Sequence, residues 1–237
     1  MAALKKRYPD AAIDFLVEAP SDQALRGNPH IHSIEVYRSH NPIDYLGWLF
    51  RVRAKRYDWV IDFMGNPRSA AITAASGARV KAGPSHVGHC WAYNTPLTQS
   101  DTTHYAGQEK IRVLKTLDVP EQDFMPKLYF SGLAASPENR VGLVPASRRV
   151  PRRWPAASYA QLGKLLRDKH QCKITVFWGP GERALAEEVA SGIGEGAEIS
   201  QETADIQALA GLISKCRLVV TNCNGPKHIA VARGVAT

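Results

Sequence analysis

The C-terminal stretch of the chain, VVTNCNGPKHIAVARGVAT, contains residue types and spacing that suit anion binding. The apolar, β-branched run at residues 218–220 predicts a buried strand, which Asn222, Asn224 and Gly225 interrupt. Pro226 suits the first position of a helix, because its missing N–H would have no partner there. A helix N-terminus after a strand and a tight turn offers N–H groups and a positive dipole end to a phosphate. Spacing alone fits an ordinary strand–helix connection equally well.

The same stretch resembles the donor-site signature of the heptosyltransferases, the family-nine glycosyltransferases that build the lipopolysaccharide core. Those enzymes end a strand with a run similar to Gly-Asn-Asp-Ser/Thr-Gly-Pro-x-His-Leu-Ala, and residues 221–230, TNCNGPKHIA, follow it in register. The resemblance implies that Asn222, Asn224 and the amides around Gly225 meet the donor sugar and phosphates. His228 would donate to a phosphate, although helix capping or packing suits this histidine nearly as well.

Cys223 departs from the family pattern, which usually has Asp at this position. A thiol cannot supply the charge-assisted acceptor that a carboxylate offers to sugar hydroxyls. We therefore expect weaker donor binding or a different choice of sugar donor.

Two further predicted strands end in residues that suit a nucleotide. The family places Lys or Arg before a Trp-Pro pair, and the run Arg152-Arg153-Trp154-Pro155 matches it, with Trp154 expected to pack on the following helix. A guanidinium can bind phosphate oxygens through two parallel hydrogen bonds, so Arg152 is the candidate for the diphosphate. Glu182 either accepts hydrogen bonds from ribose hydroxyls or simply occupies the first turn of its helix. The candidate donor-binding residues are thus Arg152, Glu182, Asn222, Cys223, Asn224, Gly225, Pro226 and His228.

Asn66 and Arg68 are the candidate acceptor-binding residues. They follow a strand at residues 57–63 in a segment similar to the family's strand-Gln-Gly-x-x-Arg-Ser, with Met64 replacing Gln. The family's acceptor is a phosphorylated, lipid-linked saccharide, which a guanidinium would suit. An exposed arginine in a first helical turn explains Arg68 equally well.

No catalytic residue is assigned. An inverting transfer needs a base for the acceptor hydroxyl, and the family's base is an Asp in a segment that this chain would lack. Asp58 and Asp62 lie in a predicted strand and are poor substitutes. We expect no cofactor and no metal. His86, His89 and Cys90, with His104 not far along the chain, have the residue types of zinc ligands, but a zinc site needs convergent geometry and usually a fourth partner.

Strand and helix patterns alternate in both halves of the chain, which predicts an α/β fold with parallel sheets covered on both faces. Strands are expected at residues 12–17, 34–37, 57–63, 80–84, 141–145, 173–178 and 217–221, and helices at 42–55, 70–75, 103–117, 156–169, 182–191, 205–215 and 227–233.

The stretch between residues 119 and 140 carries three prolines and little periodicity, and we place the domain boundary there. This predicts an N-terminal, acceptor-side domain at residues 1–130 and a C-terminal, nucleotide-sugar-binding domain at residues 140–237. The resemblance implies two Rossmann-like domains facing a cleft, called GT-B. It also implies that the chain is incomplete at both termini, without the first strand of one domain and the last part of the other.

The composition is that of a globular protein, with 44% hydrophobic and 22% charged residues and no apolar run long enough for a membrane span. An excess of basic residues gives a net charge of +8 and gathers at residues 51–56 and 148–153. An anionic membrane surface, a phosphorylated substrate or a solvated face would explain it, and nucleic acid ranks last because no nucleic-acid module is evident. We expect a cytoplasmic protein, with peripheral contact at the inner face of the inner membrane as an option.

These patterns lead to one main functional prediction. The chain would move a heptose from ADP-heptose to the lipopolysaccharide inner core, with inversion and without metal. Two alternatives stay open: a family-nine transferase with another sugar donor, and a non-catalytic nucleotide-binding remnant.

Overall fold

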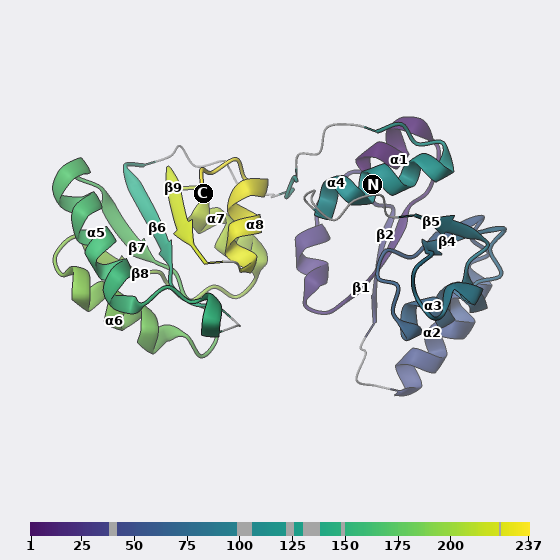
Figure 1. The fold of residues 1–237 in the computed structure, drawn as a ribbon, viewed down its shortest axis with the longest axis horizontal. Helices are drawn as coiled ribbons and strands as arrows, with labels where there is room; N and C mark the ends of the chain where they lie inside the picture. Colours follow the sequence, from purple (N-terminus) through teal and green to yellow (C-terminus); the bar gives the residue numbers. More distant parts are fainter. Residues whose placement is uncertain (38–41, 99–105, 122–125, 130–137, 148–149, 223) are drawn as a thin grey trace. The chain divides into compact units, whose positions relative to one another are not determined.

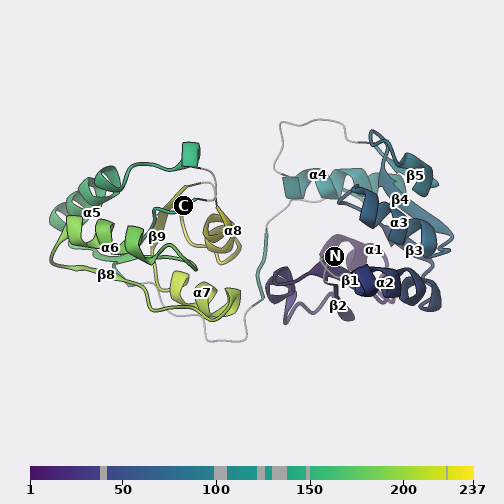
Figure 2. The ribbon, with the colours of Figure 1, turned by 90° about the horizontal axis from the view of Figure 1, so that it is seen from below.

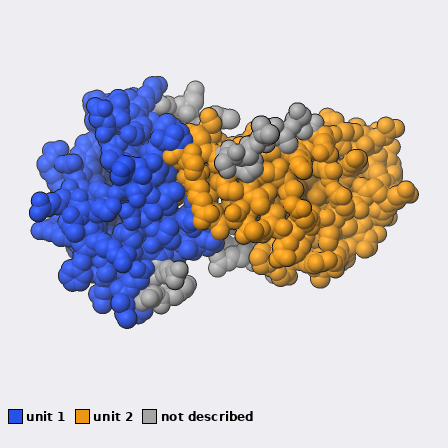
Figure 3. Space-filling model, turned by 180° about the vertical axis from the view of Figure 1, so that it is seen from behind, with its two compact units in different colours: residues 1–22, 29–124 blue, residues 23–28, 125–237 orange. Residues whose placement is uncertain are grey.

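Two compact units make up the chain (Figure 3). This computed structural model describes residues 1–37, 42–98, 106–121, 126–129, 138–147, 150–222 and 224–237. Unit 1 comprises Met1–Asp22 and Pro29–Phe124, and unit 2 comprises Gln23–Asn28 and Met125–Thr237. Gln23 shows why its segment belongs to unit 2: its side-chain oxygen accepts the Ile206 N–H at 3.0 Å. The sequence did not indicate this exchange of a short segment between the units.

Unit 1 contains two parallel sheets, β1-β2 and β3-β4-β5 (Figure 1). Its elements are α1 (Ala2–Arg7), β1 (Asp14–Glu18), a 3-10 turn (Ser21–Leu25) that reaches into unit 2, β2 (Ser33–Tyr37), α2 (Pro42–Ala54), β3 (Trp59–Ile61), α3 (Pro67–Ala75), β4 (Val80–Pro84), a 3-10 turn (Cys90–Ala92), β5 (Thr95–Leu97), α4 (Ala106–Arg112) and a 3-10 turn (Val113–Leu117).

Two apolar clusters hold unit 1 together. One packs α1 and the turn after α4 on the sheet β3-β4-β5 around Ala82, Leu97 and Leu114. The other packs α2 on α3 through Trp48 and Ile72. Figure 2 shows the helices of both clusters, α1, α2 and α3, beside the strands of unit 1. The carboxyl ends of β3, β4 and β5 lie at one edge of their sheet, because the three strands are parallel.

Unit 2 is built on one parallel sheet with the strand order β8-β7-β6-β9. Its elements are β6 (Arg140–Val144), a 3-10 turn (Val150–Arg152), α5 (Ala156–His170), β7 (Lys173–Val176), α6 (Arg183–Ile193), β8 (Ala197–Ile199), α7 (Ile206–Ile213), β9 (Leu218–Thr221) and α8 (Gly225–Ala232).

Helices cover both faces of the unit 2 sheet, which explains why β6 and β7 are apolar along nearly their whole length (Figure 1). Leu143 and Ile174 face α5 and α6, whereas Val219 packs with Ile213 of α7 and Ala230 of α8. An ideal Cβ on Gly163 of α5 would lie 2.4 Å from the Ile193 side chain, so the glycine permits the close approach of α5 and α6.

The predicted α/β class with parallel sheets is confirmed in both units. Two short strands, β5 and β8, were not predicted, because TPL and AEI carry no apolar, β-branched run, unlike β3, which has the same length but lies in YDWVIDF. The helix expected at 103–117 is α-helical only over Ala106–Arg112 within the described residues, and a 3-10 turn continues it. None of the helices in the described part of the chain is long and apolar enough to cross a membrane.

Candidate functional site

The carboxyl ends of β6 and β9 form the point where the strand order of unit 2 reverses. From β6 the chain moves outward through β7 to β8, and β9 then pairs with β6 on its other side. The loops after β6 and β9 therefore run in opposite directions, and open α/β sheets bind ligands in the crevice that such loops leave. Among the described residues, every predicted donor-binding residue except Glu182 lies in these two loops or in the first turn of α8 (Gly225–Ala232).

Asn222 joins the two loops through both ends of its side-chain amide. Its Nδ2 donates to the Pro145 carbonyl at 2.7 Å, and its Oδ1 accepts the Trp154 N–H at 3.2 Å. The start of the β6–α5 loop is buried, with Ala146 only 4% exposed. Asn222 thus fixes both ends of the loop that carries Arg152.

Asn224 makes a second link between the loops and also caps α8. Its Nδ2 donates to the Ala146 carbonyl at 2.8 Å. Its Oδ1 accepts the Lys227 N–H at 3.3 Å and lies 2.8 Å from the Thr221 hydroxyl. The backbone of Asn224 is extended and α8 starts at the next residue, as an N-cap requires. The hydrogen bond between Thr221 and Asn224 was not predicted from the sequence, although a hydroxyl residue directly before the turn could have suggested it.

The N-terminus of α8 is the feature best suited to a phosphate. Pro226 has no N–H, and the Lys227 N–H donates to the Asn224 side chain. The Gly225 N–H is therefore the first amide that the helix can offer to a ligand. An ideal Cβ on Gly225 would meet no atom of the described residues within 4 Å. His228 is exposed in the same first turn, which argues against a packed histidine. Cys223 lies outside the described residues.

Neighbouring arginines in the β6–α5 loop have different surroundings. Arg153 donates from Nε to the Ser147 carbonyl at 2.7 Å and so closes its own loop. Arg152 is exposed at the end of a 3-10 turn, on the loop that Asn222 fixes. The Trp154 ring packs edge-on against Tyr159 of α5 with centroids 5.0 Å apart, as expected.

Tyr159 of α5 contacts both ends of the β6–α5 loop, a role that was not predicted from the sequence. Its side chain is 1% exposed, and its hydroxyl donates to the Val144 carbonyl at 3.2 Å. Burial raises the pKa of this hydroxyl to about 12, so it remains a donor at neutral pH.

Glu182 lies after β7, at the same carboxyl edge of the sheet. It is the N-cap residue of α6, and its Oε2 accepts the Gly179 N–H at 3.1 Å. The carboxylate therefore orders the Gly-rich turn, and its remaining lone pairs can still accept hydroxyl groups.

The predicted acceptor residues lie in unit 1, at the start of α3. Asn66 forms a capping box with Ser69: its Oδ1 accepts the Ser69 N–H at 2.9 Å, and its own N–H donates to the Ser69 hydroxyl at 3.2 Å. Arg68 is exposed in the first turn. Gly65 turns the chain before the cap with a φ of 61°, a conformation that favours glycine.

Asp62 organises this turn from the end of β3. It is 6% exposed, and its Oδ1 accepts the N–H groups of Met64 and Gly65 at 2.8 and 3.0 Å. Its Oδ2 accepts the Tyr93 hydroxyl at 2.7 Å, and burial followed by this bond raises the pKa of Tyr93. Asp62 was expected within a strand, but β3 ends at Ile61 and the residue belongs to the turn, where three donors occupy its carboxylate.

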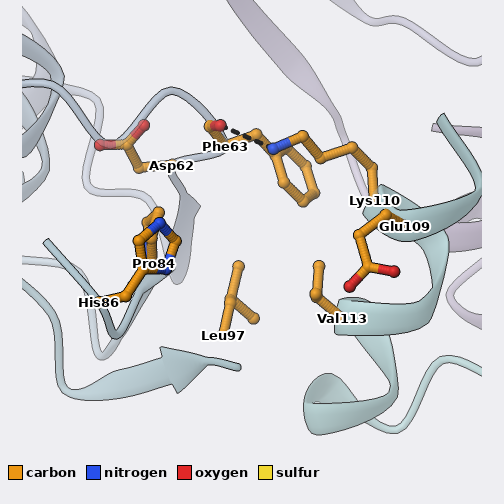
Figure 4. A pocket seen from close by; sticks show the side chains of 8 residues that line it. All are labelled: Asp62, Phe63, Pro84, His86, Leu97, Glu109, Lys110 and Val113. Atoms are coloured by element: carbon orange, nitrogen blue, oxygen red, sulfur yellow. Dashed lines mark hydrogen bonds between the residues drawn. The ribbon is translucent and has the colours of Figure 1, made fainter. Parts of the chain in front are cut away.

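A pocket of about 120 Å³ opens beside Asp62 at the carboxyl edge of β3-β4-β5 (Figure 4). Its wall combines side chains from the strand ends with Glu109 and Lys110 of α4. Lys110 donates to the Phe63 carbonyl at 2.9 Å and lies over the Phe63 ring. The sequence did not single out Glu109 or Lys110. Carboxylates, an ammonium group and His86 together suit a small hydroxylated group.

The histidines with metal-ligand types do not form a cluster within the described residues. His89 Nε2 lies 2.5 Å from the Gly65 carbonyl oxygen, and His86 lines the pocket. No group of three or more His, Cys, Asp or Glu side chains among the residues described could hold a metal ion.

Known proteins match this chain along nearly all of its length. The family model of glycosyltransferase family 9 (heptosyltransferase) matches residues 49–236. Lipooligosaccharide heptosyltransferase 2 of Haemophilus ducreyi is 23% identical, and the match covers 97% of this chain and 73% of that protein.

Solved structures show the same fold. A family 9 glycosyl transferase from Veillonella parvula superimposes with a TM-score of 0.85 at 20% identity, covering 99% of this chain and 72% of that one. The E. coli heptosyltransferase WaaC with ADP-2-deoxy-2-fluoro heptose gives a TM-score of 0.83 at 20% identity, covering 98% and 80%.

Proposed function

The chain belongs to glycosyltransferase family 9, the heptosyltransferase family, and we propose that it moves a heptose from ADP-heptose to the lipopolysaccharide inner core. The proposed transfer inverts the anomeric carbon and needs no metal ion. Its acceptor is a phosphorylated, lipid-linked saccharide, met at an anionic membrane surface on the inner face of the inner membrane. The names of two matched proteins support this direction: one is a lipooligosaccharide heptosyltransferase, and the other was solved with an ADP-heptose analogue.

The observation that carries the proposal is the double asparagine link at the strand-order reversal of unit 2. Asn222 and Asn224 bind three main-chain groups of the β6–α5 loop and hold it beside the N-terminus of α8. The link leaves open space beside Gly225 among the described residues. A diphosphate in this position would face the helix dipole and Arg152.

These groups would act on the leaving ADP. The acceptor hydroxyl oxygen forms a bond to the anomeric carbon while the bond to the diphosphate oxygen breaks, and the hydroxyl proton passes to a base. Negative charge then grows on the diphosphate, where Arg152, the α8 N-terminus and His228 would stabilise it without a metal. We assign no residue of this chain as the base.

The nucleoside and the acceptor would occupy other residues. Glu182 would accept hydrogen bonds from the ribose hydroxyls through the carboxylate lone pairs that the Gly179 N–H does not use. Asn66 and Arg68 would meet the acceptor, with Arg68 binding its phosphate because its guanidinium is exposed in a first helical turn.

Cys223 supports a second candidate, a family 9 transferase with another sugar donor. A thiol accepts hydrogen bonds from sugar hydroxyls weakly, so the sugar preference can differ while the nucleotide site is kept. The third reading is a nucleotide-binding protein without catalysis.

Calorimetric titration of the 237-residue protein with ADP, UDP and GDP separates these candidates. Preference for ADP supports the ADP-heptose proposal, and preference for UDP or GDP supports another donor. If the folded protein binds none of the three, the donor-site proposal is wrong.

Arg152→Ala should weaken ADP binding by more than about tenfold, because charge-assisted bonds to the diphosphate are lost. Lys169→Ala is the control, since it removes one exposed positive charge at the other end of α5. Equal affinity of Arg152→Ala and Lys169→Ala would refute the phosphate role of Arg152.

A further inference from the structure

Helix α2 is apolar on both of its faces. Its inner face packs Trp48 and Val52 against α3, so the fold already uses that face. Its outer face exposes Ile43 at 80%, Leu46 at 54% and Phe50 at 76%. Figure 1 shows α2 beside α3 at the edge of unit 1.

The three exposed side chains form one stripe, since they are spaced three and four residues apart along the helix. Single exposed apolar residues are ordinary on a protein surface, whereas a contiguous group marks an interaction site. The stripe therefore calls for a partner with an apolar component.

Basic residues border this stripe. At roughly 100° per residue, Arg51 follows the stripe on one side. The Arg53 guanidinium instead lies against Gly77 in the turn after α3, where an ideal Cβ on that glycine would be 1.8 Å from it. Arg51 lies over the Trp48 ring, 5.1 Å from its centroid. Arg56 is exposed just beyond the helix. The only acidic residue of α2 is Asp44, which lies 3.7 Å from Arg51.

Lys55 belongs to a different arrangement and is not part of the stripe's border. Its ammonium group lies 2.8 Å from Glu35 and 3.4 Å from Asp14, both in the β1-β2 sheet. The positive charge available at the surface of α2 thus comes from arginines, whose guanidinium groups bind phosphates well.

We propose that this face of α2 docks the protein on an anionic lipid bilayer. We define the α2 face as Ile43, Leu46, Phe50, Arg51 and Arg56. The apolar stripe would enter the boundary between headgroups and acyl chains, and the arginines would remain at the level of the lipid phosphates. The proposal gives the membrane contact in the proposed function a definite surface, and it rests on that function only for the choice of membrane.

Charge favours a bilayer over a second copy of this chain. A two-fold pairing of α2 faces would bring together two copies of the same patch, each with a net positive charge. Like charges across an interface are unfavourable, whereas anionic headgroups complement the arginine border. A bilayer satisfies both the apolar stripe and its charge.

Vesicle cosedimentation tests the proposal with the full chain. The probes are vesicles of phosphatidylcholine alone and of phosphatidylcholine mixed with phosphatidylglycerol, at low salt and at about 0.15 M, where the screening length is about 8 Å. We expect binding to the mixed vesicles, weaker at the higher salt, and little binding to phosphatidylcholine alone. The wild-type protein failing to bind mixed vesicles at low salt would overturn the proposal.

Variants locate the surface. The double substitution Ile43→Ser with Phe50→Ser should reduce binding to mixed vesicles by at least about tenfold. Arg51→Gln with Arg56→Gln should reduce it and weaken its salt dependence. Leu165→Ser is the matched control, because Leu165 is 52% exposed on α5 in unit 2. Unchanged binding in the Ile43/Phe50 variant would show that another surface is used.

Two further readouts separate this proposal from its rivals. Without lipid, the wild-type protein should sediment as a monomer. A wild-type dimer that is absent in the Ile43/Phe50 variant would assign the face to a second copy of the chain. ADP affinity should be the same in all of these variants. A wild-type protein that binds mixed vesicles but not ADP would count against the donor site and leave the α2 face supported.

Discussion

Asn222 and Asn224 form hydrogen bonds within the protein itself, in the absence of any ligand. Their side chains bind carbonyl groups of Pro145 and Ala146, which belong to the loop after β6. The family resemblance implied direct contact with the donor. The geometry adds a positioning role, because each amide holds the two walls of the proposed diphosphate site together.

Asn224→Ala should lower the free energy of unfolding by about 1–2 kcal/mol, since it removes the cap on Lys227 and the link to Ala146. Asn224→Asp keeps an oxygen for the cap but loses the amide donor to Ala146. It should therefore be more stable than Asn224→Ala and still bind ADP more weakly than the wild type. Urea unfolding and calorimetry measure the two effects. Wild-type ADP affinity in Asn224→Asp would contradict the positioning role.

Cys223→Asp should keep or improve affinity for the nucleotide sugar, because it restores the acceptor that the family usually has for sugar hydroxyls. The measurement is titration with ADP-heptose beside ADP, with Cys223→Ser as the control that adds a hydroxyl without charge. A clear loss of affinity in Cys223→Asp would indicate that this turn does not bind the sugar as the resemblance implies.

Among the elements of unit 1, β1, β2 and the chain before β3 are joined by one group of charges around Asp14. Its carboxylate lies 2.9 Å from His32, 2.8 Å from the Tyr57 hydroxyl and 3.4 Å from Lys55. Burial alone would raise the pKa of Asp14, but these hydrogen bonds together outweigh it, and the pKa lies below its usual value. The hydrogen bond from Lys55 likewise holds the pKa of Glu35 low.

Unfolding free energy should therefore fall in acid. Because the folded pKa of Asp14 is below the unfolded value of about 3.9, its contribution is complete above that pH and is lost as pH falls toward the folded pKa. Asp14→Asn should be less stable at pH 7 and lose less stability between about pH 5 and pH 3. Urea unfolding across this range measures both, with Glu188→Gln, an exposed change on α6, as control. Parallel pH profiles of wild type and Asp14→Asn would contradict this assignment.

Two units with separate cores make up the whole molecule, so a ligand can stabilise one unit directly. The proposed donor site lies wholly in unit 2, at the ends of β6, β7 and β9. Asp62 and its pocket lie in unit 1. This separation makes the location of the donor site measurable.

ADP at about 100 times its dissociation constant should stabilise the state that binds it by about 2.7 kcal/mol. Hydrogen exchange should then slow at the amides of unit 2 around Asn222, Asn224 and Gly225. Amides of the Asp62 turn in unit 1 serve as the internal control. Slowing confined to the Asp62 turn would move the donor site to unit 1.

The sequence alone predicted the features that depend on neighbours along the chain. Alternating patterns predicted the α/β class, and Pro226 predicted a helix start that the structure places at Gly225, because a fixed proline φ acts within one helical turn. The capping role of Asn224 was not predicted. The turn signature also led to the family. The strand β5 was not predicted, because the three residues TPL show neither a period nor an apolar run.

Tertiary structure alone decided which distant groups meet. The strand order β8-β7-β6-β9 places the turn after β9 beside the loop after β6, and only then can Asn222 reach Pro145. Tertiary packing likewise decided three other features: the place of Gln23–Asn28 in unit 2, the group of charges around Asp14 and the exposure of Phe50. Hydrogen bonding and burial between segments far apart in sequence depend on how the sheets and helices pack, and local propensity does not encode that packing.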